Sequence, residues 1–159
     1  MSAYQGPVYF GQPKMYLRHV YDSVPEFELG KARWLREGKD VTLIACGITV
    51  GICMDAAKLL QEKGIEAGVL NVPSIKPLDE EAVLKAASMT KRIVTCENHS
   101  IIGGLGSAVA EVLAEHNCDA RLRRAGLKDC FGMTASLACQ LEANGLTREA
   151  IADLVCGMK

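Results

Sequence analysis

A polar run at residues 97–100 holds the residue types in this chain that are best suited to chemistry. Glu97 and His99 lie two positions apart, so they could act as a general acid/base pair, or the carboxylate could orient the histidine. Nucleophilic catalysis would need a third group, and the serines nearby do not lie in a recognisable nucleophile motif. A structural or interface histidine is therefore the favoured interpretation, with acid/base chemistry as the alternative.

Three glycines follow this polar run and precede a helical pattern, so backbone amides there could bind a phosphate. Their G-G-x-G spacing differs from the G-x-G-x-x-G fingerprint of dinucleotide-binding proteins. A tight turn that lets the helix pack closely on a sheet is the favoured role of the glycines. The candidates for an interface or anion site are Glu97, His99, Gly103, Gly104 and Gly106.

The remaining reactive residue types form weaker patterns. Arg121, Arg123 and Arg124, with Lys128 nearby, are expected to form a solvated edge or a subunit contact, with an anion site as the minority interpretation. The chain has seven cysteines, an odd number without a C-x-x-C pair, which favours reduced thiols in the cytoplasm. The histidines have no spacing suited to a metal, so no metal site is predicted.

Composition narrows the functional classes. The chain has 159 residues, 49% hydrophobic residues and a net charge of −1, as is usual for a single globular domain. The small net charge gives no electrostatic reason to expect nucleic acid or an anionic membrane as a partner. No stretch approaches the length of apolar residues that a membrane span needs.

Strand and helix patterns alternate through most of the chain. Residues 6–10 suggest a short strand, and an irregular linker runs to about residue 26. Strands are expected at 32–36, 41–45, 67–72, 92–96 and 119–124, and helices at 50–63, 79–88, 104–116, 135–144 and from 147 onward. Asp79 and Thr147 are the expected N-caps of two of these helices.

This order predicts an α/β fold with a mostly parallel sheet that is covered on both faces. The connection between the strands at 32–36 and 41–45 is so short that the two strands are expected to pair antiparallel, with 32–36 at the edge. Ligand sites in such sheets lie beyond the carboxyl ends of the strands, where residues 97–106 are expected.

Several separated motifs resemble the C-terminal domain of transketolases. They are EFELGKA at 26–32, LREGKDVTLIACG at 35–47, KPLD at 76–79, ENHSIIGGLGS at 97–107 and FG at 131–132. The resemblance implies a three-layer α/β/α sandwich with a mixed five-stranded sheet. It also implies that residues 1–26 are the end of a preceding pyrimidine-binding domain with a linker, and that residues 27–159 are the C-terminal domain.

The family transfers a two-carbon ketol unit between sugar phosphates with thiamine diphosphate and magnesium. In the family, the cofactor-binding motifs belong to the diphosphate-binding and pyrimidine-binding domains, and no such motif is present here. The chain alone is therefore expected to be inactive and to bind no cofactor. Its expected role is structural, as part of a homodimer or with an N-terminal subunit that carries the missing domains. No catalytic residue is carried over from the family.

One site residue follows from the resemblance. Lys14 falls where the family places an arginine that contacts the substrate phosphate, and a lysine keeps the charge but loses the bidentate geometry. Two alternatives stay open. The chain could be a phosphate- or nucleotide-binding regulatory module, or the C-terminal part of a related enzyme such as deoxyxylulose-phosphate synthase or a 2-oxoacid dehydrogenase β subunit.

Overall fold

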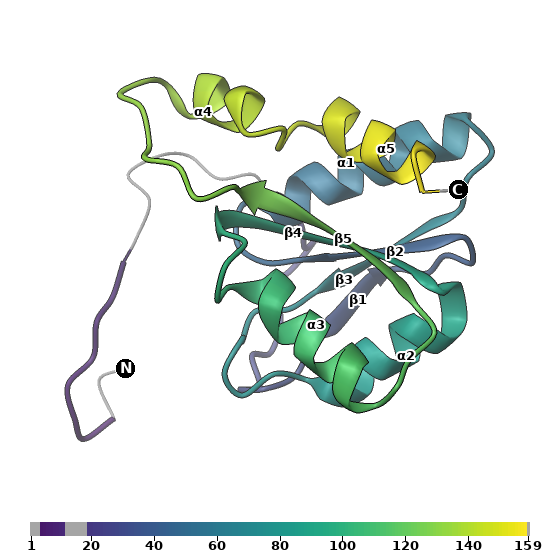
Figure 1. Cartoon of the computed structure of the whole chain (residues 1–159). Coiled ribbons are helices and arrows are strands. Elements are labelled where there is room, and N and C mark those ends of the chain that lie inside the picture. The colour runs from purple at the N-terminus through teal and green to yellow at the C-terminus, as the bar shows by residue number, and fades with distance from the viewer. Residues whose placement is uncertain (1–3, 12–18, 159) are drawn as a thin grey trace.

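The sheet of this protein places its four parallel strands side by side and adds one antiparallel strand at an edge (Figure 1). The computed structural model describes residues 4–11 and 19–158. The strands are β1 (Arg33–Arg36), β2 (Val41–Ala45), β3 (Ala67–Asn71), β4 (Arg92–Ser100) and β5 (Arg121–Leu127). The helices are α1 (Thr49–Glu62), α2 (Glu80–Thr90), α3 (Leu105–Glu115), α4 (Leu137–Ala143) and α5 (Arg148–Cys156).

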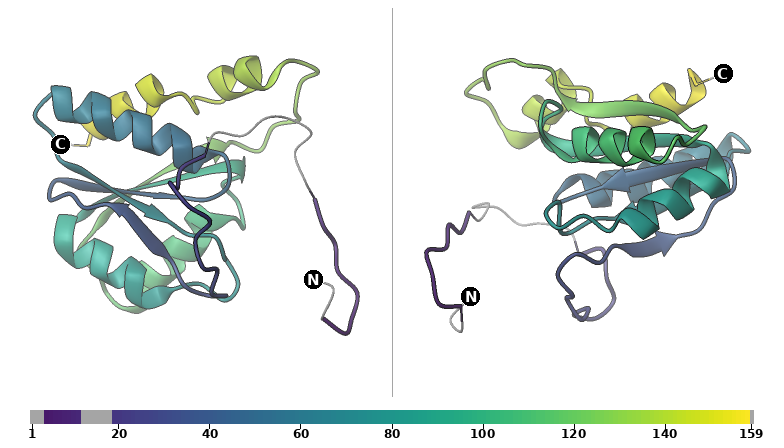
Figure 2. Two further views of the ribbon diagram at one scale, coloured as in Figure 1. Left: turned by 180° about the vertical axis from the view of Figure 1, so that it is seen from behind. Right: turned by 60° about the horizontal axis from the view of Figure 1, so that its bottom comes forward.

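Helices cover both faces of the sheet, which confirms the predicted α/β/α architecture. Helices α1 and α5 pack on one face and α2 and α3 on the other, as the two orientations in Figure 2 show. Alternate residues of the strands belong to the two hydrophobic cores on opposite faces of the sheet. Leu43 belongs to the core under α1, and its neighbour Ile44 belongs to the core under α2 and α3. All five residues of β2 are buried, as expected for a central parallel strand.

Two of the predicted helix caps are present. The side chain of Asp79 accepts a hydrogen bond from the amide of Ala82, and that of Thr147 accepts one from the amide of Ala150. These side chains satisfy amide groups that would otherwise have no partner in the first turn of a helix. Local sequence rules therefore place the starts of α2 and α5 correctly.

The partner of β1 differs from the prediction. The strand order is β1-β3-β2-β4-β5, so β1 lies at the edge and is antiparallel, but it pairs with β3 rather than β2. The connection after β1 crosses the start of β3, where the amides of Lys39 and Asp40 both donate to the carbonyl of Glu66. Gly38 makes this crossing possible, because a Cβ at position 38 would overlap the backbone of Ala67 and Gly68.

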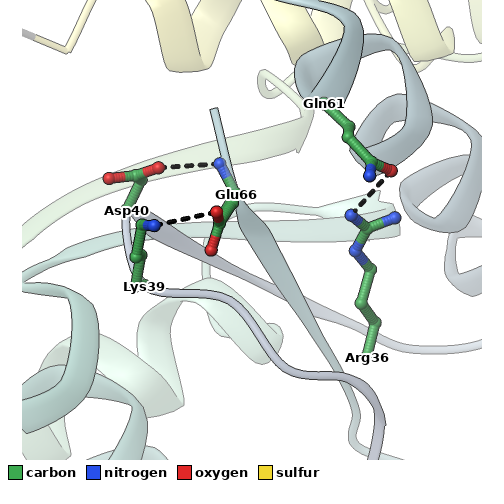
Figure 3. A network of polar contacts seen from close by, with 5 residues as sticks. All are labelled: Arg36, Lys39, Asp40, Gln61 and Glu66. Atoms are coloured by element: carbon green, nitrogen blue, oxygen red, sulfur yellow. Dashed lines mark hydrogen bonds and ion pairs between the residues drawn. The ribbon is translucent and has the colours of Figure 1, made fainter. Parts of the chain in front are cut away.

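Polar side chains reinforce this crossing at the amino end of the sheet (Figure 3). The ammonium group of Lys39 lies 2.8 Å from Oε1 of Glu66, and the amide of Glu66 donates to Oδ2 of Asp40 at 2.7 Å. Nearby, the guanidinium of Arg36 donates to Oε1 of Gln61 at 3.0 Å. These five polar residues therefore pair with one another at the amino edge of the sheet.

Three further predictions are corrected. Residues 6–10 do not form a strand. Strand β4 continues through the polar run to Ser100, because Ser100 pairs with Leu127 after an irregularity in register. Strand β5 begins at Arg121 and extends to Leu127, three residues beyond its expected end, for the same reason.

Candidate functional site at the carboxyl end of β4

The carboxylate of Glu97 binds the first turn of α3. Glu97 is almost fully buried, with 1% of its surface exposed, and its two oxygens accept hydrogen bonds from the amides of Leu105 and Gly106, each at 2.8 Å. A negative charge at a helix N-terminus is favourable because the free amides and the helix dipole both attract it. Glu97 thus acts as the cap of α3, although it lies eight residues before the first of these amides.

The glycines make room for this carboxylate. A Cβ at Gly104 would overlap Oε2 of Glu97, and one at Gly126 would lie 3.0 Å from Cγ of Glu97. A Cβ at Gly106 would lie 2.8 Å from Oγ1 of Thr95. Gly103 has a different role, since its φ of +72° lies in the left-handed region that favours glycine. Gly104 and Gly106 therefore allow the start of α3 to pack closely against the sheet, which is the role that the sequence pattern favours.

Side chains from α3 and β5 hold the turn between Glu97 and α3. The hydroxyl of Ser107 donates to the carbonyl of Ile101 at 3.0 Å and accepts from the amide of Gly103 at 2.9 Å. The guanidinium of Arg124 donates to the same carbonyl at 2.9 Å, and its aliphatic part covers Gly106. Arg124 therefore stabilises this turn, and its role differs from that of the rest of the predicted basic cluster.

The other members of that cluster are exposed. Arg123 donates only a long hydrogen bond, 3.5 Å, to the carbonyl of the neighbouring Leu122. Arg121 lies at the start of β5, and Lys128 follows its end. The structure thus brings one arginine of the cluster to the site and leaves the others along the edge strand.

His99 does not complete an acid/base pair with Glu97. Both carboxylate oxygens of Glu97 are bound by amides of α3, and among the described residues no hydrogen bond joins them to His99. His99 is exposed near the end of β4, whereas Glu97 is buried. The amides of Leu105 and Gly106 are likewise occupied, which argues against an external anion at these two groups. An interface role for His99 stays a prediction.

A second feature of the carboxyl edge is a cavity of about 290 Å³ beside the turn that follows β2. This turn and the end of β4 meet where the connections of neighbouring strands leave in opposite directions, the usual ligand position in such sheets. The side chains that line the cavity are apolar or uncharged, among them Ile48, Asn98, Leu127, Phe131 and Met133. Phe131 and Met133 lie in a segment without hydrophobic periodicity, so the sequence pattern alone does not point to them as cavity residues.

Buried thiols surround the start of α1. Burial is the main cause that raises the pKa of Cys46 to about 11, and the charge of Glu97 and the neighbouring Cys96 add to it. The pKa of Cys53 is also raised, by a hydrogen bond with Cys96 and by burial. The hydroxyl of Thr49 lies 2.7 Å from the carbonyls of both Cys46 and Cys96 and so ties β2 to β4. A raised pKa favours the protonated thiol at Cys46 and Cys53, which lowers their reactivity as nucleophiles.

The chemistry of thiamine diphosphate would require groups that bind its magnesium ion. Among residues 4–11 and 19–158, no cluster of three histidine, cysteine, aspartate or glutamate side chains could hold a metal. Lys14 lies outside the described residues. No helix in the described part of the chain is long and apolar enough to cross a membrane.

Comparison with known proteins identifies the family. Residues 30–151 match the family model described as Transketolase, C-terminal domain. The 6-deoxy-6-sulfo-D-fructose transketolase subunit SqwH of Clostridium sp. (strain MSTE9) is 49% identical over 149 residues, 94% of this chain and 46% of that protein. A 1-deoxy-D-xylulose-5-phosphate synthase of Heliobacterium modesticaldum is 38% identical over 94% of this chain and 23% of its own length.

A solved structure agrees with these matches. The chain is similar to one described as split gene transketolase, inactive beta4 tetramer, with a TM-score of 0.83 and 41% identity. That match covers 88% of this chain and 46% of the solved one. The chain therefore spans about half the length of the transketolase subunits that it matches.

Proposed function

We propose that this chain, which belongs to the transketolase C-terminal domain family, is the C-terminal section of a transketolase that works only with the sections it lacks. The complete enzyme would move a two-carbon ketol unit between sugar phosphates. Thiamine diphosphate and magnesium would be bound by the other sections, in a homodimer or with a separate N-terminal subunit. The reducing conditions that suit seven free cysteines are those of the cytoplasm.

One observation carries this proposal: the carboxyl end of β4, where an α/β sheet usually binds its ligand, is filled by the chain's own Glu97. Two amides at the start of α3 are hydrogen-bonded to a carboxylate and do not face a cleft. The domain thus has a structural cap in the position of a phosphate site. A structural role also fits a chain that covers about half of the subunits it matches.

The test is an activity comparison between the chain alone and the chain in a larger subunit. We would join this chain to the half of the 49% identical transketolase subunit that it does not match, and combine the fusion with that enzyme's other components. Transfer of a two-carbon unit is expected from the assembled fusion and not from the chain alone.

Two results would contradict the proposal. Turnover by the isolated chain would show that it contains a complete active site. Saturable binding of inorganic phosphate or a nucleotide by the isolated chain, measured by calorimetry and lost in Gly104→Val, would favour the alternative of a regulatory module. Gly104→Val must remain folded by circular dichroism for that comparison, because its side chain would displace Glu97.

A further inference from the structure

Large apolar side chains are exposed at one end of the sheet. Among the described residues, those that are exposed outside the segment before β1 are Ile75, Met89, Ile102, Phe131 and Met133. Four of these five follow the carboxyl end of a parallel strand: Ile75 follows β3, Ile102 follows β4, and the other two follow β5. Met89, near the end of α2, is the exception.

The opposite end of the sheet has a different surface. There charged side chains bind one another, as Lys39 does with Glu66 in Figure 3, and Met89 at the end of α2 is the exposed large apolar residue. Isolated exposed apolar residues are ordinary in soluble proteins, but several at one edge mark a surface that binds another macromolecule. The contrast between the two ends therefore points to an interface at the carboxyl end.

The segment after β5 is only partly packed against the rest of the chain. Phe131 is fully exposed and Met133 is 56% exposed, and both lie at the cavity of about 290 Å³ that has no charged residue in its lining. Helix α4, which forms another wall of this cavity, has no buried residue. Apolar side chains around an uncharged hollow suit an apolar partner surface rather than a charged small molecule.

We propose that this carboxyl edge, defined as Ile75, Asn98, His99, Ile102, Phe131 and Met133, is the surface on which the missing half of the transketolase subunit docks. The inference rests on the proposed function, and it identifies the surface through which this chain would contact the rest of the subunit. The apolar residues would form the centre of the contact. Asn98 and His99, both exposed at the end of β4, would supply hydrogen bonds at its rim.

The path of the chain supports this occupant over others. The matched transketolase subunits carry about as many further residues as this chain has. The segment that precedes β1 is tied to the same edge, because the side-chain amide of Asn71, the last residue of β3, donates to the hydroxyl of Tyr21. The described residues further toward the N-terminus expose Tyr9 and Phe10 and lie apart from the sheet (Figure 1). A polypeptide continuous with this segment would therefore be held beside the carboxyl edge.

The experiment compares hydrogen exchange in the isolated chain with that in the fusion described above. Backbone amides at residues 99–103 and 129–134 are expected to exchange at least about tenfold more slowly in the fusion, because the docked half would cover them. Amides at residues 37–40, at the opposite edge, should exchange at the same rate in both. Equal exchange of the carboxyl-edge loops in the two proteins would overturn the inference.

A matched pair of methionine variants gives an independent measurement. Met133→Ser should lower the melting temperature of the fusion by several degrees and leave that of the isolated chain within about one degree. Met89→Ser, at an exposed methionine away from the proposed surface, should leave both unchanged. Equal effects of the two variants on the fusion would overturn the inference.

Other occupants give distinct results. Protection of the same loops in the isolated chain that is lost on dilution, with a matching change in sedimentation, would assign the surface to a second copy and overturn the inference. Transferase activity of the fusion reports separately on the proposed function. An active fusion with unprotected loops would refute only the docking surface, and an inactive fusion with protected loops would refute only the function.

Discussion

The carboxylate of Glu97 occupies the space that a side chain at position 104 would need. A Cβ on Gly104 would overlap Oε2 of Glu97 and would lie 2.6 Å from the carbonyl oxygen of Ser100. The glutamate and the glycine therefore depend on each other: the first caps α3, and the absence of a side chain at the second lets it do so.

Replacing Glu97 by glutamine should destabilise the domain. Glutamine keeps the shape but offers one acceptor oxygen for two amides and loses the charge that favours a helix N-terminus. We expect the free energy of unfolding to fall by about 1–3 kcal/mol in urea titrations. Glu111→Gln, at an exposed glutamate of the same helix, is the control and should change it by less than about 0.5 kcal/mol. Equal losses in the two variants would contradict the capping role.

Two neighbouring glycines should respond to alanine for different reasons. At Gly103 a Cβ would meet nothing within 4 Å, so the variant should cost only the strain of its left-handed backbone, about 1 kcal/mol. Gly104→Ala should cost clearly more, because the methyl group would displace Glu97. The cost of Gly104→Ala should shrink in a Glu97→Ala background, which a double-mutant cycle measures. Additive losses would show that the two residues are independent.

Adjacent arginines of β5 provide another matched comparison. Arg124→Ala removes the donor to the carbonyl of Ile101 and the cover over Gly106, so the free energy of unfolding should fall by about 1 kcal/mol. Arg123→Ala, at an exposed position with only a long local hydrogen bond, should leave it within about 0.5 kcal/mol. A larger loss at Arg123 would disprove the assignment of Arg124 as the residue that holds the turn.

Stability should fall in alkaline solution as the thiols of the unfolded chain ionise. The pKa of Cys46 rises from 9.0 to about 11 on folding, mainly through burial, so the unfolded chain loses this proton first. Between about pH 9 and pH 11 the folded state therefore binds more protons, and the free energy of unfolding decreases with pH. Cys46→Ala should reduce this decrease between pH 8 and pH 10, whereas alanine at the exposed Cys156 should not. An unchanged pH dependence in Cys46→Ala would contradict the shift.

Lys14 is predicted to contact the substrate phosphate in the assembled enzyme. In the active fusion, Lys14→Met should raise the KM for a phosphorylated aldose by about tenfold, because one charge-assisted hydrogen bond is lost. Lys14→Arg should retain or improve binding, since a guanidinium can donate two parallel hydrogen bonds. An equal rise in KM for an unphosphorylated aldose would argue against contact with the phosphate.

Local patterns were sufficient for most of the secondary structure. Hydrophobic periodicity located each strand and helix from residue 32 onward to within a few residues, and capping rules identified Asp79 and Thr147. The neighbour of β1 was not predictable in this way. It depends on the close packing of Gly38 against residues 67–68, thirty positions further along the chain.

The candidate site shows the same limit. The sequence pattern draws attention to the polar run and the glycines, and it suggests an acid/base pair of Glu97 and His99 as one alternative. The role of Glu97 as a cap was missed because caps are usually sought next to the helix, and this one lies at the end of the preceding strand. The polar residues 97–100 were also expected to leave the sheet, whereas long-range pairing of Ser100 with Leu127 keeps β4 together with β5 to its end.

The internal cap of α3 has a consequence for anions that approach this end of the sheet. A phosphate group that reaches the carboxyl end of β4 meets the oxygens of Glu97 already bound to the amides of Leu105 and Gly106. A phosphate would have to displace this carboxylate to bind these two amides. The helix start, which in many α/β folds binds a phosphate, is in this case neutralised by a side chain of the domain itself.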